Sequence, residues 1–121
     1  MRRSDVNSRT LDRLVSVRSA ARLRAFRRDA ERALPGMIDS VLLFGSRARG
    51  EARRDSDYDV AVLLKGAERP PSARALLSDA AYRHIVAGVH IRPIAILTEN
   101  VREDGPLPVC RNIARDGIPV R

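Results

Sequence analysis

The chain has 121 residues, of which 44% are hydrophobic, 31% charged and 3% aromatic. This length suits one domain with its own core, and we expect no separate substrate-binding domain. The 23 basic and 15 acidic residues give a net charge of +8. Such a charge favours an anionic partner, namely a nucleotide, a nucleic acid or an acidic protein surface. The composition predicts one soluble, globular domain over residues 1–121.

The positive charge is concentrated near the start, since residues 1–33 contain 10 arginines and 4 acidic residues. We interpret this run as a helix face that meets solvent or a partner. No run approaches the roughly 20 apolar residues that cross a bilayer, and no signal-peptide pattern follows the first arginines. The single Cys110 cannot form an internal disulfide, and we expect it to pack as a small side chain. These features predict a cytoplasmic protein without a membrane partner.

The predicted elements begin with apolar residues at helical spacing, which indicate a first helix over 8–34. The segment 37–44 predicts a buried strand, a short helical turn is expected at 46–51, and a second strand is predicted over 57–64. The link between these strands is too short for a packed crossover helix. We therefore expect the two strands to be antiparallel.

The second half of the chain adds a helix that begins after Ser72 and ends at Gly88. A third strand is predicted over 89–96, and Pro93 restricts that strand to an edge or a bulge because proline cannot donate to a ladder. A short amphipathic segment follows at 109–115. This order predicts an α+β fold: a small mixed β-sheet flanked by helices, with its motif core at about 37–98.

The residues that could carry chemistry lie between the first two strands. Gly45 would let a ligand approach the backbone, and Ser46 opens a turn whose hydroxyl and N–H groups suit a phosphate. Asp57 and Asp59 are two residues apart at a strand start, so both carboxylates point to one face and Tyr58 to the other. Paired carboxylates suit a Mg²⁺ ion that also holds substrate phosphates. The pattern indicates a metal-dependent site for a nucleoside triphosphate.

This stretch resembles the minimal nucleotidyltransferases, or MNT proteins, of the DNA polymerase β superfamily. Their motif is Gly-Ser, an Ala-Arg-Gly-like turn and then Ser-Asp-x-Asp, which stands here at 45–50 and 56–59. The tail at 111–118 is also similar to the chain end of many members. The resemblance covers roughly residues 10–118 and implies a single domain with a polymerase-β-like nucleotidyltransferase fold.

The resemblance implies a role for each matching residue. Gly45 and Ser46 would hold the triphosphate, and Arg47 and Arg49 in the motif turn could touch its phosphates. Asp57 and Asp59 would be the first two metal-binding, catalytic carboxylates. In the family, two Mg²⁺ ions align an attacking hydroxyl against the α-phosphate, a nucleoside monophosphate is transferred, and pyrophosphate leaves.

Many MNT proteins look like antitoxins encoded beside a helical HEPN-domain toxin, and some transfer AMP to a tyrosine of that toxin. The resemblance therefore implies Mg²⁺-dependent transfer of AMP from ATP to a hydroxyl on a HEPN-type partner. The arginine-rich first helix could dock that partner or a nearby RNA. Against direct nucleic-acid binding, the basic residues are not interleaved with stacking aromatic residues. The sequence leaves open whether the chain also associates with copies of itself.

The sequence departs from the family pattern at the third carboxylate, because residues 87–98 contain no acid. By spacing, His90 falls at that position, where neutral imidazole could act as a base or a weak metal ligand. Alternatively the third carboxylate is absent, one metal binds with the nucleotide, and the attacking hydroxyl is poorly activated. We favour the second interpretation, because Mg²⁺ prefers oxygen ligands and Arg92 would point to the same face and repel a cation.

Two functions from different classes follow from this departure. The first is a nucleotidyltransferase whose acceptor comes from another protein. The second is a catalytically weakened module that binds nucleotide or partner and neutralises a HEPN-type toxin by forming a complex with it.

Overall fold

The computed structural model describes residues 10–121, which form one four-stranded sheet in the order β3-β2-β1-β4. Strand β1 (Ile38–Phe44) is antiparallel to β2 (Tyr58–Leu64), as its short connection predicts. Strand β3 (Ile91–Leu97) is parallel to β2, and β4 (Ile118–Pro119) is antiparallel to β1. The mixed sheet confirms the predicted α+β fold.

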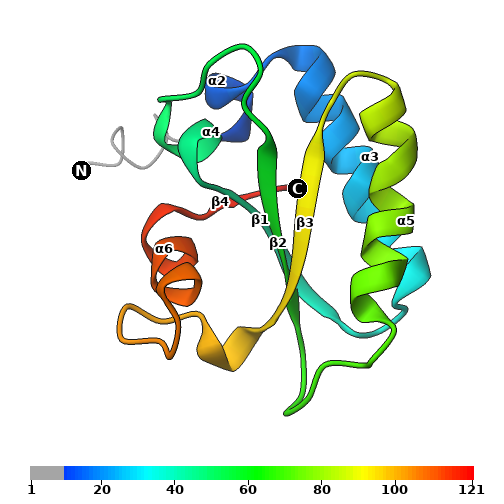
Figure 1. The fold of residues 1–121 in the computed structure, drawn as a ribbon, viewed down its shortest axis with the longest axis vertical. Coiled ribbons are helices and arrows are strands. Elements are labelled where there is room, and N and C mark those ends of the chain that lie inside the picture. Colours follow the sequence, from blue (N-terminus) through cyan, green and yellow to red (C-terminus); the bar gives the residue numbers. More distant parts are fainter. Residues whose placement is uncertain (1–9) are drawn as a thin grey trace.

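The helices are divided between the two faces of this sheet (Figure 1). Helices α3 (Val17–Ala33) and α5 (Ala73–Val86) pack side by side on one face. Helix α6 (Pro108–Asp116) covers the other face, and it follows a short 3₁₀ turn, η1 (Thr98–Asn100). The one-turn helix α4 (Ser46–Arg49) directly follows β1. The helical turn expected at 46–51 is therefore confirmed.

The alternation of side chains along β2 decides which face carries the motif. Val60 and Val62 belong to the main core beneath α3 and α5. Ala61 and Leu63 belong to a second, smaller cluster beneath α6. Because side chains alternate along a strand, the odd-numbered Asp59 points to the face that α6 covers.

The first helix differs from its prediction over 8–34. Residues 8 and 9 lie outside the described part, and the remainder is two helices, α2 (Leu11–Leu14) and α3. Val15 between them is extended, and the Ser16 hydroxyl accepts a hydrogen bond from the Ser19 backbone N–H at 3.1 Å. This N-cap starts a new helix, because it satisfies a donor that a continuous helix would bond internally.

The tail contains a feature that its sequence did not predict. The two residues of β4 pair with Leu42 and Leu43, so β1 becomes an interior strand. Strand β3 forms the opposite edge of the sheet, where Pro93 was expected. Cys110 is buried, as expected. Among residues 10–121, no helix combines the length and the apolar character that crossing a membrane requires.

Candidate active site

Gly45 follows the last residue of β1, and its backbone comes close to the predicted Asp59 carboxylate. Its φ angle is +77°, and a Cβ atom built on it would lie 2.5 Å from Oδ2 of Asp59. Phe44 and Asp59 are partners in the β1–β2 ladder, which fixes this approach. A side chain at position 45 would therefore collide with the Asp59 carboxylate. Ser46 follows as the first residue of α4, and it is half-buried.

Asp57 and Asp59 point to the same side, as the two-residue spacing predicts, and one guanidinium spans them. Nε of Arg92 donates to Oδ1 of Asp59 at 2.8 Å, and Nη1 lies 3.4 Å from Oδ2 of Asp57. The parallel register between β2 and β3 places Arg92 directly beside Asp59. The hydrogen bond that Arg92 donates to Asp59 raises the pKa of its guanidinium above the ordinary value. The strand neighbour of Asp59 is thus a permanently charged cation.

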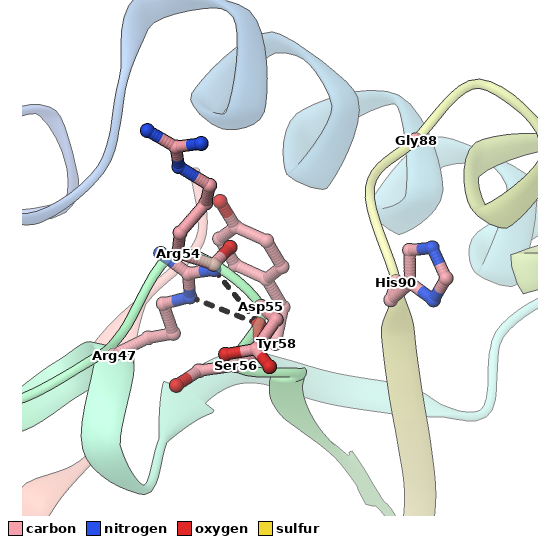
Figure 2. Close-up of a pocket in the computed structure, with 7 residues that line it drawn as sticks. All are labelled: Arg47, Arg54, Asp55, Ser56, Tyr58, Gly88 and His90. Atoms are coloured by element: carbon pink, nitrogen blue, oxygen red, sulfur yellow. Dashed lines mark hydrogen bonds between the residues drawn. The ribbon is translucent and has the colours of Figure 1, made fainter.

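His90 lies just before β3, two residues ahead of Arg92, and its side chain is exposed. Its backbone carbonyl accepts a hydrogen bond from the Tyr58 N–H at 2.9 Å. His90 lines a cavity of about 290 Å³ that Arg47 and Ser56 also line (Figure 2). The structure therefore brings His90 to the edge of the motif, while the residue in register with Asp59 is Arg92.

Arg47 is engaged by the loop that joins α4 to β2. Its Nη2 donates to the carbonyl oxygens of Ser56 at 2.8 Å and of Arg54 at 3.2 Å, and Nε also donates to Ser56. The guanidinium carbon lies 4.1 Å from the ring centre of Tyr58, at stacking distance. Figure 2 shows this side chain reaching across to the loop. Arg47 thereby holds the segment that leads into the carboxylates.

Arg49 connects α4 to α6. Its Nε lies 2.9 Å from Oε1 of Glu51, and its Nη1 lies 3.2 Å from Oδ2 of Asp116. The hydrogen bonds that Arg49 donates to Glu51 and Asp116 raise its pKa. Asp116 is buried, and hydrogen bonds from Arg115 and then Arg49 lower its pKa although burial opposes this. Sequence reasoning missed Asp116, because a charge pair 67 residues apart leaves no local pattern.

The donor chemistry of the carboxylates fits one divalent cation. Two carboxylates and phosphate oxygens together can satisfy the octahedral oxygen coordination of Mg²⁺. Within residues 10–121, no group of three or more His, Cys, Asp or Glu side chains is arranged to hold a metal. Asp57 and Asp59 could therefore hold a single metal shared with a triphosphate, and no third carboxylate of residues 10–121 is grouped with them.

Comparisons with known proteins identify the family of the chain and relatives of its fold. The family model described as polymerase β nucleotidyltransferase matches residues 34–120. A curated Methanocaldococcus jannaschii protein, named as a candidate protein adenylyltransferase, is 42% identical over 43 residues. That alignment covers 36% of this chain and 43% of the relative, so the match spans less than half of the curated protein.

Two solved structures share the fold. A candidate nucleotidyltransferase from Sulfolobus solfataricus superimposes with a TM-score of 0.59 at 19% identity, over 98% of this chain and 87% of its own. A toxin–antitoxin structure with AMP-PNP superimposes with a TM-score of 0.55 at 18% identity, over 81% of this chain and 72% of its own. At these identities the likeness establishes the architecture alone.

Proposed function

This chain belongs to the polymerase β nucleotidyltransferase family, and from that premise we propose that it transfers a nucleoside monophosphate from a nucleoside triphosphate to a hydroxyl group. The contact between the Gly45 backbone and the Asp59 carboxylate carries the proposal. It places a turn suited to binding phosphates next to a carboxylate suited to binding a divalent cation. We propose ATP as the donor.

In the proposed reaction, the acceptor oxygen attacks the α-phosphorus in line with the leaving group. The new oxygen–phosphorus bond forms as the bond from the α-phosphorus to the β-bridging oxygen breaks, and pyrophosphate leaves. Mg²⁺, held by Asp57 and Asp59 with phosphate oxygens, would neutralise charge on the triphosphate. Gly45 and Ser46 hold the triphosphate in place, and the proton of the hydroxyl passes to His90 or to solvent.

Arg47 and Arg49 contribute mainly through position in this proposal. Both guanidinium groups are bound to protein oxygens, so a phosphate would have to share or replace those contacts. They keep α4 and the following loop in shape, and they add positive potential beside the triphosphate. A direct contact from either arginine to a phosphate would add to the binding of the triphosphate by Ser46.

We further propose that the acceptor hydroxyl lies on a partner protein and that the chain acts as an MNT-type antitoxin toward a helical HEPN-type toxin. The curated relative's name, a protein adenylyltransferase, supports a protein acceptor. The fold shared with a toxin–antitoxin structure supports the pairing. Both supports come from other proteins, so the acceptor is the part of the proposal that experiment must identify.

A second candidate function is a nucleotide- or partner-binding module with weakened catalysis. The observation that favours it is the ion pair of Arg92 with both carboxylates. One guanidinium already offsets one of the two negative charges, and residues 87–98 contain no acid to activate the acceptor hydroxyl. In this alternative the chain would neutralise its partner by forming a complex with it.

The deciding experiment incubates the chain with ATP labelled at the α-phosphate, Mg²⁺ and the protein encoded by the adjacent gene. We expect label on that protein, and its loss when Asp57→Asn is combined with Asp59→Asn. The matched control is Arg102→Gln, which removes an exposed arginine paired with Asp104 outside the motif. Transfer at the wild-type level by the double variant would refute the metal assignment. An unlabelled partner, under conditions where nucleotide binds, would favour the binding module.

A further inference from the structure

Arg92 and a metal ion would compete for the carboxylates of Asp57 and Asp59. The Arg92 contacts engage Oδ1 of Asp59 and Oδ2 of Asp57, and a divalent cation held by the pair would need oxygens of these same two groups. A guanidinium stays protonated at every pH at which the protein is folded, so it cannot leave by losing its charge. A metal can therefore enter only if Arg92 moves or tolerates a second cation beside it.

Arg92 has the freedom to move that this exchange needs. Its side chain is 66% exposed, whereas that of Asp59 is 19% exposed. It lies on β3, which is an edge strand, and it lines a cavity of about 390 Å³ together with Asp57, His90 and residues of α5. Rotation of the arginine would leave the buried core intact, because its neighbours Ile91 and Pro93 stay in the strand.

We propose that Arg92 and a divalent cation are alternative occupants of the Asp57–Asp59 pair, so that the free protein excludes metal and admits it together with a triphosphate. A triphosphate brings several negative charges, which offset the second cation and offer the displaced guanidinium a new bidentate partner. The identity of the metal and of the triphosphate rests on the proposed function. Arg92 is thus a positioning residue that makes the nucleotide a condition for metal binding.

The test measures binding of Mn²⁺ alone, without nucleotide, by the electron paramagnetic resonance signal of the free ion. We expect the wild-type protein to bind Mn²⁺ weakly and Arg92→Gln to bind one ion about tenfold more tightly, because removing a charge near a divalent ion changes its binding to that extent. Arg92→Lys keeps the charge and should stay near the wild-type affinity. Arg102→Gln removes a comparable exposed arginine and should not change Mn²⁺ affinity.

The location of the gained site is checked by adding Asp59→Asn to Arg92→Gln, which should abolish the gain. Equal Mn²⁺ affinity in Arg92→Gln and the wild type would overturn the proposal, and so would a gain that survives loss of the Asp59 carboxylate. A second readout is the unfolding temperature, which Mn²⁺ should raise more in Arg92→Gln than in the wild type. Neither measurement involves transfer of a nucleotide, so failure here and failure of the proposed reaction are distinguishable.

Discussion

Gly45 is constrained twice, by its backbone angle and by its neighbour. Its φ of +77° lies in the left-handed region that L-residues rarely adopt, and the Asp59 carboxylate fills the space where a Cβ would stand. Gly36 has nearly the same angle, +74°, but nothing lies within 4 Å of its Cβ position. The two glycines therefore separate the cost of the angle from the cost of the contact.

Alanine at Gly45 should lower the free energy of unfolding by about 1–3 kcal/mol more than alanine at Gly36, because only the first adds a steric clash to the backbone strain. Urea denaturation of both variants measures the difference. Introducing Asp59→Ala together with Gly45→Ala should recover part of the loss, since it removes the colliding oxygen. Equal losses of unfolding free energy at the two glycines would mean that Asp59 does not clash with a side chain at position 45.

At the scale of an element, Arg47 makes several of the contacts that hold the segment between α4 and β2. The planar guanidinium of Arg47 reaches two backbone carbonyls, those of Arg54 and Ser56, and stacks on Tyr58. Tyr58 is fixed in turn by its hydroxyl, which lies 2.8 Å from the Ser19 hydroxyl on α3. The carboxylates that follow the loop therefore depend on contacts that reach into the helical layer.

Lysine at Arg47 should loosen this loop, because one ammonium group cannot reproduce the flat, forked contacts of a guanidinium. We expect faster amide hydrogen exchange in residues 50–57 and a loss of about 1 kcal/mol in the free energy of unfolding. Mass spectrometry of the exchanged peptides measures the first, and denaturation the second. Arg102→Lys is the matched control. Exchange in residues 50–57 that matches the wild type would show that other contacts hold the loop.

The elements that follow local patterns could be predicted from the sequence. The strands at 37–44 and 57–64 were predicted from mostly apolar segments, and the common direction of Asp57 and Asp59 from the period of a strand. The break at Ser16 was missed because apolar spacing continues across it, although a serine there is a standard N-cap. Strand β4 has two residues, too few to show a period.

The individual residues of the candidate site could be predicted from the sequence, whereas the ion pairs between them could not. The sequence placed Arg92 on the face of the carboxylates, yet the ion pair with both of them depends on the parallel register of β2 and β3. Register between strands 33 residues apart is set by packing on both faces of the sheet, not by a local signal. The pairing of Arg49 with Asp116 depends on tertiary packing in the same way.

Across the whole molecule, arginines connect distant parts of the chain. On α3, Nη1 of Arg27 donates to the Val120 carbonyl at 2.8 Å, Arg24 donates to the carbonyl of Arg121, and Arg18 donates to that of Ala87. Part of the positive charge near the start of the sequence therefore ties α3 to the tail and to the end of α5. These contacts add an internal role to the solvent- or partner-facing surface that the arginine run predicts.

The interface between α3 and α5 contains a buried polar cluster. His84 is completely buried, and its Nε2 donates to Oδ2 of Asp29 at 2.9 Å. Arg83 and Arg32 also bond to Asp29, and Nη1 of Arg22 lies 3.4 Å from Nδ1 of His84. Burial lowers the pKa of His84 in spite of the Asp29 carboxylate. Burial alone would raise the pKa of Asp29, but hydrogen bonds from Arg83 and His84 bring it below its ordinary value.

This cluster predicts a stability that falls on acidification, starting near neutral pH. The unfolded chain protonates His84 at about its ordinary pKa of 6.5, while the folded protein resists protonation to a lower pH. Between those two values the unfolded state binds more protons, so stability is full above 6.5 and declines as the pH falls. Asp29 acts in the same direction below its ordinary pKa of 3.8.

One titrating group limits the slope of this decline to about 1.4 kcal/mol per pH unit. Free energies of unfolding from urea titrations at pH 7.5, 6 and 5 should decrease in the wild type. Glutamine in His84→Gln keeps an amide donor for Asp29 but cannot be protonated, so the part of the decline that begins near pH 6.5 should disappear. An unchanged slope in that variant would show that the pH dependence does not arise from protonation of His84, which lies between Asp29 and Arg22.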